Sequence, residues 1–254
     1  AQTVSEARRL AQLEKVNFVI GPMSSSQALA VAPIFNEAKV VYFSTSVAPI
    51  PTQYNFSPMY SSTAYAQAIA NFAKQNLQAK NVAILSDNGA AGKAAVEDWK
   101  KIVPAMGMTI TGVQEHETRG ADITPQLLSL RRGNPDVILH TTSTGEDAGL
   151  MIKTLAEIGW NPKIVTSSAG MALGGTLKVA GADAFKSGQL FSVLPKSHTY
   201  CASEKVGDRG YDRWLTRLKA FDPANFDKID HKSALYMYDG LVMLRAAVTG
   251  ARSV

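Results

Sequence analysis

Residues 82–89 read VAILSDNG, an apolar run that ends in a turn of serine, aspartate, asparagine and glycine. The same order of apolar run and polar turn recurs in DVILHTTST at residues 136–144 and in KIVTSS at residues 163–168. Near the start of the chain it occurs in NFVIGPMSSS, residues 17–26, and in VVYFSTS, residues 40–46. Runs rich in valine and isoleucine without alternation are typical of strands buried on both faces. The pattern predicts an open parallel α/β sheet with hydroxyl groups along its carboxyl edge, where such sheets bind ligands.

A regular spacing separates the candidate strands in the middle of the chain. They begin near residues 82, 109, 136, 163 and 189, about 27 residues apart. Helical patterns fill the gaps, at residues 90–106, 123–132, 146–158 and 172–180. Strand, helix and parallel strand at this interval form the βαβ unit, and its repetition predicts a sheet covered by helices on both faces.

The two ends of the chain form a second block. A helix at 4–15, a strand at 17–20, a helix at 26–38 and a strand at 40–43 are expected first, and helices at 210–221 and 231–249 close the chain. Pro49, Pro51 and Pro58 forbid a continuous helix between the blocks, and Pro195 opens a second polar stretch. We therefore expect two lobes, residues 1–60 with 196–254, and residues 61–195.

The composition is that of an ordinary globular protein, with 254 residues and 46% hydrophobic content. No apolar run approaches the roughly 20 residues that span a bilayer. No signal pattern opens the chain, so we expect either a cytosolic protein or one whose export signal was removed before residue 1. Lysine and arginine exceed aspartate and glutamate by 26 − 21 = 5. Because these charges are scattered along the helical patterns, we expect no nucleic-acid partner.

Motifs for cofactors, metals and catalysis are absent from the sequence. It contains neither a G-x-G-x-x-G nor a G-x-x-x-x-G-K-[ST] phosphate loop, and no G-x-S-x-G nucleophile turn. The four histidines, at positions 116, 140, 198 and 231, are far apart, and Cys201 is the only cysteine. We therefore expect no cofactor, no metal site and no enzymatic activity.

Three consecutive serines, residues 24–26, follow a Gly-Pro turn at the end of a candidate strand. One hydroxyl, that of Ser25 or Ser26, is expected to cap the following helix. Another would then face outward beside the unpaired N–H groups of the helix start. That combination suits a carboxylate, because the N-terminus of a helix attracts negative charge.

Two other side chains each allow two interpretations, and a third has a simple structural one. His140 ends a candidate strand, where it faces either a ligand or the core. Tyr60 lies at the first boundary between the lobes and is either a surface residue or a stacking partner for an aromatic or apolar solute. Asp122, shortly before Pro125, is most simply a helix N-cap.

Three segments together resemble the branched-chain amino-acid type of periplasmic solute-binding proteins, the extracytoplasmic receptors of ABC importers. They are VIGPMSSSQALA at residues 19–30, GADITPQL at residues 120–127 and YDG at residues 238–240. The resemblance implies a type I periplasmic-binding-protein fold, in which hinge crossings join two Rossmann-like lobes that close on a ligand. It also implies a periplasmic monomer whose partners are a small-molecule ligand and an ABC permease. Family members have a strand before the first helix and more chain after Val254, so by this comparison the sequence is truncated at both ends.

The resemblance implies a carboxylate site in the first lobe. Ser25 matches the serine that binds the ligand carboxylate in the family. Ser46, Val47 and Ala48 match the end of the next strand, where backbone amides and a hydroxyl continue the same site.

The remaining family positions have changed in this chain. Ser62 stands where an aspartate is common, Ala91 where a tyrosine is frequent, and Ser168 lies near the glutamate that pairs with the ligand's amino group. With Tyr60 and His140, these residues complete the expected ligand site.

At both Ser62 and Ser168 an uncharged serine stands in place of an acidic residue. A ligand ammonium group would lack its buried counter-charge, which is costly. The smaller Ala91, with Tyr60 nearby, would admit a flat molecule. We therefore expect a carboxylate without an amino group, and an aromatic acid in particular. The alternatives are a ligand-sensing domain of a receptor or regulator with the same fold, and an amino-acid-binding member of the transport family.

Overall fold

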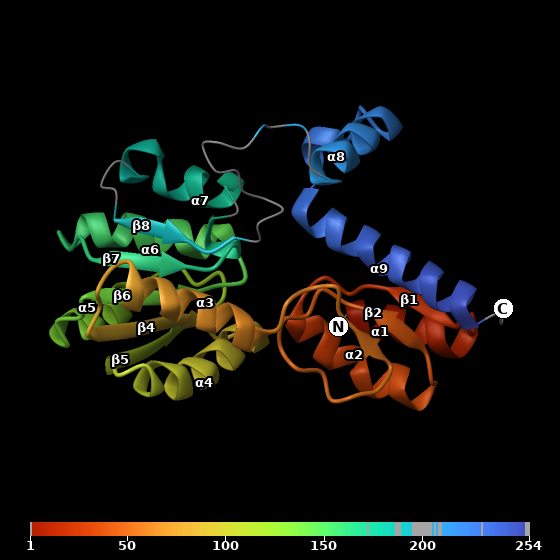
Figure 1. The fold of residues 1–254 in the computed structure, drawn as a ribbon, viewed down its shortest axis with the longest axis horizontal. Coiled ribbons are helices and arrows are strands. Elements are labelled where there is room, and N and C mark those ends of the chain that lie inside the picture. Colours follow the sequence, from red (N-terminus) through yellow and green to blue (C-terminus); the bar gives the residue numbers. More distant parts are fainter. Residues whose placement is uncertain are drawn as a thin grey trace. The chain divides into compact units, whose positions relative to one another are not determined.

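Parallel strands form both sheets of the protein in the computed structural model (Figure 1). The structure describes residues 2–171, 173–185, 189–194, 205, 207, 210–229 and 231–251. Pro195, His198 and Cys201 lie outside the described residues. The chain divides into two units, Ala1–Tyr60 with Leu194–Val254, and Ser61–Val193. The predicted α/β class with parallel sheets is confirmed.

The first unit contains a three-stranded sheet in the order β1-β2-β3. Its elements are α1 (Gln2–Arg8), which continues as a π-helical turn, β1 (Phe18–Ile20), α2 (Ser25–Glu37), β2 (Val41–Phe43), β3 (Asn55–Phe56), α8 (Gly210–Phe221) and α9 (His231–Ala251). Tyr42 and Phe35 are buried together under α1 and α2, with ring centroids 4.9 Å apart. On the other face of the sheet α9 approaches so closely that a Cβ at Gly240 would lie 3.2 Å from that of Phe43.

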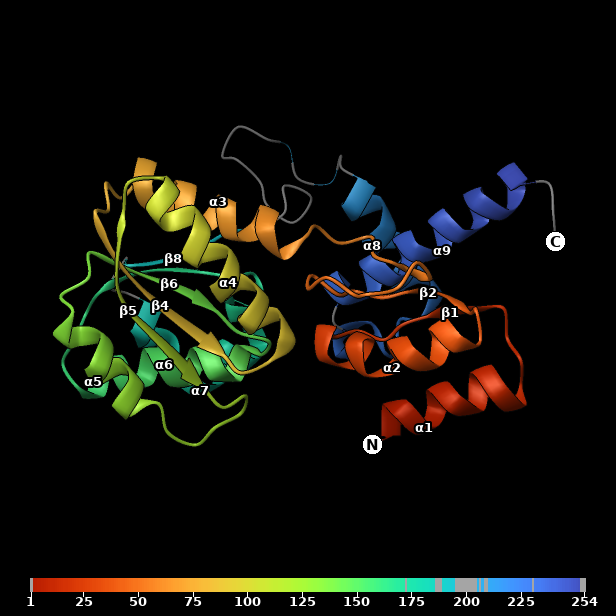
Figure 2. The ribbon, with the colours of Figure 1, turned by 90° about the horizontal axis from the view of Figure 1, so that it is seen from below.

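The second unit contains a five-stranded sheet in the order β5-β4-β6-β7-β8 (Figure 1), which Figure 2 shows from below. Its elements are α3 (Ser62–Gln75), β4 (Asn81–Asp87), α4 (Ala90–Ala105), β5 (Thr109–His116), α5 (Thr124–Arg132), β6 (Val137–Thr141), α6 (Gly145–Glu157), β7 (Lys163–Thr166), α7 (Leu173–Ala180) and β8 (Leu190–Ser192). The order of the strands reverses at β4, which lies between β5 and β6. In open α/β sheets, the loops at the carboxyl side of such a reversal are the usual place for a ligand.

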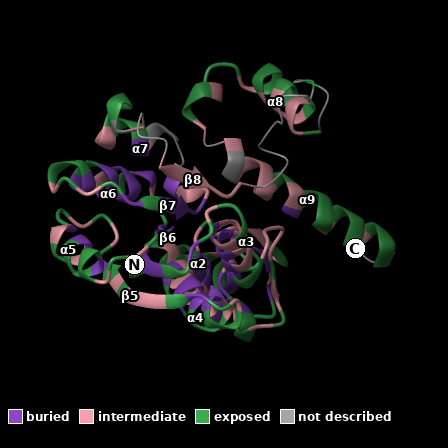
Figure 3. Cartoon of the chain, turned by 60° about the vertical axis from the view of Figure 1, so that its left-hand side comes forward, coloured by how far each residue is buried: buried purple, intermediate pink, exposed green. Residues whose placement is uncertain are grey.

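Alternate residues of these strands face opposite helical layers. Val82 and Ile84 pack with α3 and α4, where Trp99 is completely buried. Ala83 and Leu85 pack with α5 and α6 on the other face. Figure 3 shows buried residues along α6 and in β7. Both faces of the sheet are therefore covered, which explains why the strands are apolar without alternation.

Among the described residues, strand β3 and one α-helix were not predicted from the sequence. This helix, α3, begins directly after the first lobe boundary and buries Ala66, Ile69, Ala70 and Ala73. The other predicted strands and helices are present within a few residues of their expected bounds, although residues 9–13 of the first helix are π-helical rather than α-helical. Among the described residues, no helix combines the length and the apolar composition needed to cross a membrane.

Candidate functional site

The carboxyl end of β2 in the first unit brings together four residues of the expected carboxylate site. The hydroxyl oxygen of Ser25 accepts hydrogen bonds from the backbone N–H groups of Val47, at 3.2 Å, and Ala48, at 3.3 Å. Ser25 is the first residue of α2 and is buried. Because its oxygen accepts both bonds, its own proton remains available for donation to another acceptor.

The loop that carries these amides is fixed by further side chains. The hydroxyl of Ser46 donates to the carbonyl of Ala48 at 2.8 Å, and the amide of Asn55 donates to Ser44 Oγ, also at 2.8 Å. The hydroxyl of Ser57 donates to the carbonyl of Ser46 at 2.9 Å. The hydroxyl proton of Ser46 is thus used within the loop, so Ser46 shapes the site in this structure.

The N-cap of α2 is Ser24, and the expectation that Ser25 or Ser26 caps this helix is wrong. Ser24 has extended backbone angles, and its oxygen accepts a hydrogen bond from the N–H of Gln27 at 3.3 Å. The helix begins at Ser25, one residue before the predicted start at residue 26, so the N-cap position falls on Ser24. As a consequence, Ser25 does not cap the helix, and its hydroxyl oxygen is hydrogen-bonded to the loop of Val47 and Ala48.

In the second unit, Asp87 at the end of β4 holds the turn that leads to Ala91. Its carboxylate accepts hydrogen bonds from the N–H of Gly89 at 3.1 Å and from the N–H of Ser143 at 2.5 Å. Ala91 lies in the first turn of α4 and is half-buried. A Cβ at Gly92 would lie 2.2 Å from the carbonyl oxygen of Asp87, so only glycine fits there. Asp87 thereby joins the loops that follow β4 and β6.

A second buried carboxylate, that of Asp147, joins the loops after β5 and β6. It accepts a hydrogen bond from the N–H of Arg119 at 2.8 Å and one from the hydroxyl of Thr142 at 3.2 Å. In the described part of the chain, no group of three or more His, Cys, Asp or Glu side chains could hold a metal ion. The hydrogen bonds of Asp87 and Asp147 fix the loops at this edge of the sheet.

The structure places His140 in the core, which is the second of its two interpretations. Its ring has no exposed surface, and Nδ1 lies 2.7 Å from the hydroxyl of Thr166. Burial, together with the neighbouring His116, lowers the pKa of His140 to about 3, so its ring is neutral at physiological pH. In this structure His140 presents no atom to a ligand.

Ser62 has an acidic neighbour that the sequence analysis missed. Its hydroxyl donates to Oδ2 of Asp98 at 2.7 Å, and the hydroxyl of Thr63 donates to Oδ1 at 3.1 Å. Asp98 is half-buried and belongs to α4. The acid that is absent at position 62 is therefore supplied from a separate helix, and no sequence signal links the two positions.

Ser168 lies just after β7, where its N–H donates to the phenol oxygen of Tyr65. The same phenol donates to the carbonyl of Val193 at 2.7 Å. Tyr65 was not among the expected site residues, because it belongs to the helix that the sequence analysis did not predict. Tyr60 is half-buried at the end of the first segment of its unit. Asp122 accepts from the N–H of Thr124 at 2.8 Å, although the N-cap position itself is Ile123.

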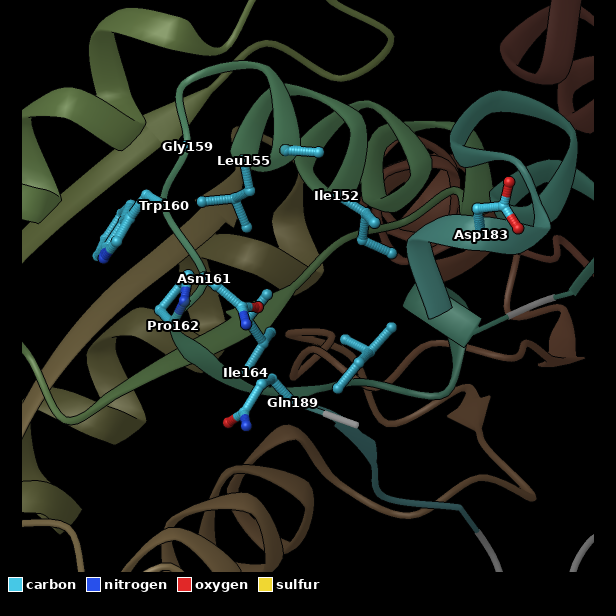
Figure 4. Close-up of a pocket in the computed structure, with 11 residues that line it drawn as sticks. Ile152, Leu155, Gly159, Trp160, Asn161, Pro162, Ile164, Asp183 and Gln189 are labelled. Carbon is cyan, nitrogen blue, oxygen red and sulfur yellow. The ribbon is translucent and has the colours of Figure 1, made fainter. Parts of the chain in front are cut away.

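The second unit also contains a cavity of about 310 Å³ at the amino ends of β7 and β8 (Figure 4). Ile152 and Leu155 of α6, Trp160 and Ile164 line it, and Asn161 and Gln189 add polar atoms. None of the expected ligand residues lines this cavity. Because it lies at the edge of the sheet opposite the carboxyl ends, we assign the candidate site to the polar loops instead.

The whole chain, residues 1–254, matches the family model described as periplasmic binding protein, and the chain belongs to this family. Leu/Ile/Val-binding protein homolog 7 of Brucella abortus is 26% identical over 196 residues, which are 72% of this chain and 49% of that protein. The chain thus spans about half the length of the curated relatives it matches.

Solved structures of type I periplasmic binding proteins share the fold. A leucine-binding protein, LivK, of Thermotoga maritima superposes with a TM-score of 0.79 at 21% identity, covering 99% of this chain and 69% of that one. An ABC-transporter solute-binding protein of Rhodopseudomonas palustris, in complex with 4-hydroxybenzoate, gives a TM-score of 0.76 at 20% identity, covering 97% and 66%. The fold predicted from the resemblance is therefore confirmed.

Proposed function

We propose that the protein is an extracytoplasmic solute-binding protein that captures a small carboxylate and delivers it to the permease of an ABC transporter. We further propose that the protein acts in the periplasm and has no enzymatic activity. Membership of the periplasmic binding protein family supports it. The single observation that carries it is the cluster of the Ser25 hydroxyl with the amides of Val47 and Ala48.

This cluster has the chemistry of a carboxylate site. A carboxylate accepts hydrogen bonds and donates none, and the cluster offers two backbone N–H groups and one hydroxyl proton beside the start of α2. A ligand carboxylate would take the place that Ser25 Oγ occupies at the two amides, and the hydroxyl of Ser25 would donate to it. Charge-assisted bonds of this kind are stronger than the neutral ones they replace.

For the ligand we propose an aromatic acid without an α-amino group, bound with the help of Tyr60, Ala91 and Ser168. The uncharged Ser168 supports this choice, because it provides no counter-charge for an ammonium group. A solved structure of the same fold, at 20% identity, holds 4-hydroxybenzoate. His140 is left out, because its ring is fully buried.

A second candidate, an amino-acid ligand, is favoured by one observation. The half-buried carboxylate of Asp98 lies beside Ser62, where family members commonly have an aspartate. It would neutralise an ammonium group if the ligand came near it. Curated relatives carry the name Leu/Ile/Val-binding protein, in agreement with this alternative.

Calorimetric titration separates the two candidates. The ligands are benzoate, 4-hydroxybenzoate, leucine and the 2-keto acid that corresponds to leucine. We expect the aromatic acids to bind and the keto acid to bind more tightly than leucine. Tighter binding of leucine than of its keto acid would favour the amino-acid candidate, and failure of all four to bind would refute the proposed ligand class.

A further inference from the structure

Unpaired buried polar atoms are concentrated at one edge of the second sheet. In the described part of the chain, five buried side-chain atoms have no hydrogen-bond partner, and four of them lie at carboxyl ends of strands. These are Ser86 Oγ, His116 Nε2, His140 Nε2 and Ser167 Oγ. Buried polar groups are nearly always paired, because an unpaired one loses its bonds to water without replacement. The two histidine atoms belong to the opposite face of the sheet from the two serines. The unpaired hydroxyls of Ser86 and Ser167, at the edge where such sheets bind ligands, therefore point to a polar occupant on their own face.

The two serines belong to a row of hydroxyl groups on the α3–α4 face of the sheet. Side chains alternate along a strand, so Ser86 faces the same side as Ile84, Thr141 the same side as Leu139, and Ser167 the same side as Val165. Ser86 pairs in register with Thr141. The N–H of Ser167 donates to the carbonyl of His140 at 3.1 Å, which continues the ladder between β6 and β7. Ser86, Thr141 and Ser167, all buried, thus form a hydroxyl row across β4, β6 and β7.

Tyr65 and Ser168 lie at the accessible end of this row. Both are half-buried, and the phenol oxygen of Tyr65 accepts the hydrogen bond of the Ser168 N–H next to Ser167. Tyr65 also donates to the carbonyl of Val193. An incoming hydroxyl group can replace the phenol at the Ser168 N–H, because it accepts one hydrogen bond and donates another. This exchange would open the way to the hydroxyl of Ser167.

One exposed acid flanks the hydroxyl row, Glu115 of β5, which pairs in register with Ser86. The nearest acid along β4, Asp87, faces the opposite side of the sheet and accepts bonds from the amides of Gly89 and Ser143. The row itself borders the apolar cluster that contains Ile84 and Trp99. Between Thr141 and Ser167, at the far end of the row from Glu115, a neutral hydroxyl would find both donors and acceptors.

We propose that the hydroxyl row of Ser86, Thr141 and Ser167 binds a hydroxyl substituent of the ligand. This inference rests on the proposed function and narrows its ligand class to hydroxy-substituted aromatic acids. The row then determines specificity: a site built to pair with a hydroxyl group rejects the analogue that lacks it, because its own polar atoms stay unpaired.

The test is a titration of benzoate, 3-hydroxybenzoate and 4-hydroxybenzoate into the wild type, Ser86→Ala and Ser167→Ala. Ser129→Ala, which removes an exposed hydroxyl on α5, is the matched control. We expect at least one hydroxybenzoate to bind the wild type about tenfold or more tightly than benzoate. In Ser86→Ala or Ser167→Ala this preference should fall to about threefold or less, while the affinity for benzoate stays unchanged. The control should keep the full preference.

Thermal unfolding without ligand gives a second measurement. Deleting an unpaired buried hydroxyl should leave the melting temperature unchanged or raise it. A clear decrease in both variants would mean that structural water already pairs the row, and this would overturn the inference. An unchanged preference in both variants would overturn it too. Equal binding of benzoate and both hydroxybenzoates to the wild type would refute the hydroxyl row but not the proposed function, whereas failure of all three acids to bind would refute the hydroxyl row and the aromatic ligand class together.

Discussion

The carboxylate of Asp98 accepts a hydrogen bond from the hydroxyl of Ser62, with Oδ2 and Oγ 2.7 Å apart. The two residues are 36 positions apart in the chain, and the packing of α3 on α4 brings them together. Position 62 has a serine where family members commonly have an aspartate, and the carboxylate of Asp98 lies beside it. Whether this charge acts on a ligand can be decided by substitution.

Asp98→Asn should leave the affinity for aromatic acids unchanged, because these ligands carry no ammonium group for the carboxylate of Asp98 to neutralise. Calorimetry with 4-hydroxybenzoate and with leucine measures this. Asparagine keeps the shape of the side chain and removes only its charge, so a selective loss of leucine binding in this variant would identify Asp98 as the counter-charge of an ammonium group.

Ser25→Ala should weaken the binding of every carboxylate ligand by roughly ten- to a hundredfold, because a hydrogen bond to a charged group is lost. The affinity is measured by calorimetry with the tightest ligand. Ser24→Ala is the matched control: it removes the helix cap and should lower the free energy of unfolding by about 0.5–2 kcal/mol without a comparable loss of affinity. Equal affinities of Ser25→Ala and the wild type would place the carboxylate elsewhere.

Acid should destabilise the protein through His140. Its pKa is about 3 in the folded state and about 6.5 when exposed, so the folded state binds fewer protons. The stability that depends on the neutral ring is fully present above pH 6.5 and is lost progressively as the pH falls towards 3. At pH 5 the loss should be on the order of 2 kcal/mol.

Urea unfolding of the wild type and His140→Gln at pH 7.5 and pH 5 measures this effect. The variant should show a smaller decrease between the two pH values, whereas His231→Gln, in the first unit, should keep the decrease of the wild type. The same decrease in His140→Gln as in the wild type would assign the acid sensitivity to other groups.

Gly92→Ala should destabilise the second unit by about 1–3 kcal/mol, because the new methyl group would overlap the carbonyl oxygen of Asp87. At the exposed C-terminal end of α9, a Cβ added at Gly250 would meet nothing within 4 Å. Gly250→Ala should therefore be neutral or stabilising, by up to about 1 kcal/mol. Denaturant unfolding compares the two, and equal stability of both variants would show that the turn after Asp87 can relax.

Most of the helices and strands could be predicted from the sequence because their signals are local. The strands from β4 to β8 begin within a residue or two of the predicted positions, since buried parallel strands have a distinctive composition and βαβ units a regular length. The helix α3 was missed although its buried residues, such as Ala66, Ile69 and Ala73, follow helical spacing.

The sequence by itself determined the class of fold, the parallel order of strand and helix, and the presence of hydroxyl groups at the carboxyl edges, because each of these follows from composition and spacing along the chain. Only the tertiary structure decided which of those hydroxyl groups have partners. The hydroxyl of Ser25 accepts from the amides of Val47 and Ala48, that of Ser62 donates to Asp98, and the buried hydroxyl of Ser167 has no partner. The physical reason is that a hydrogen bond requires its donor and acceptor to be placed correctly to within a few tenths of an ångström. These atoms belong to residues far apart in the chain, and the packing of helices on the sheets sets their positions.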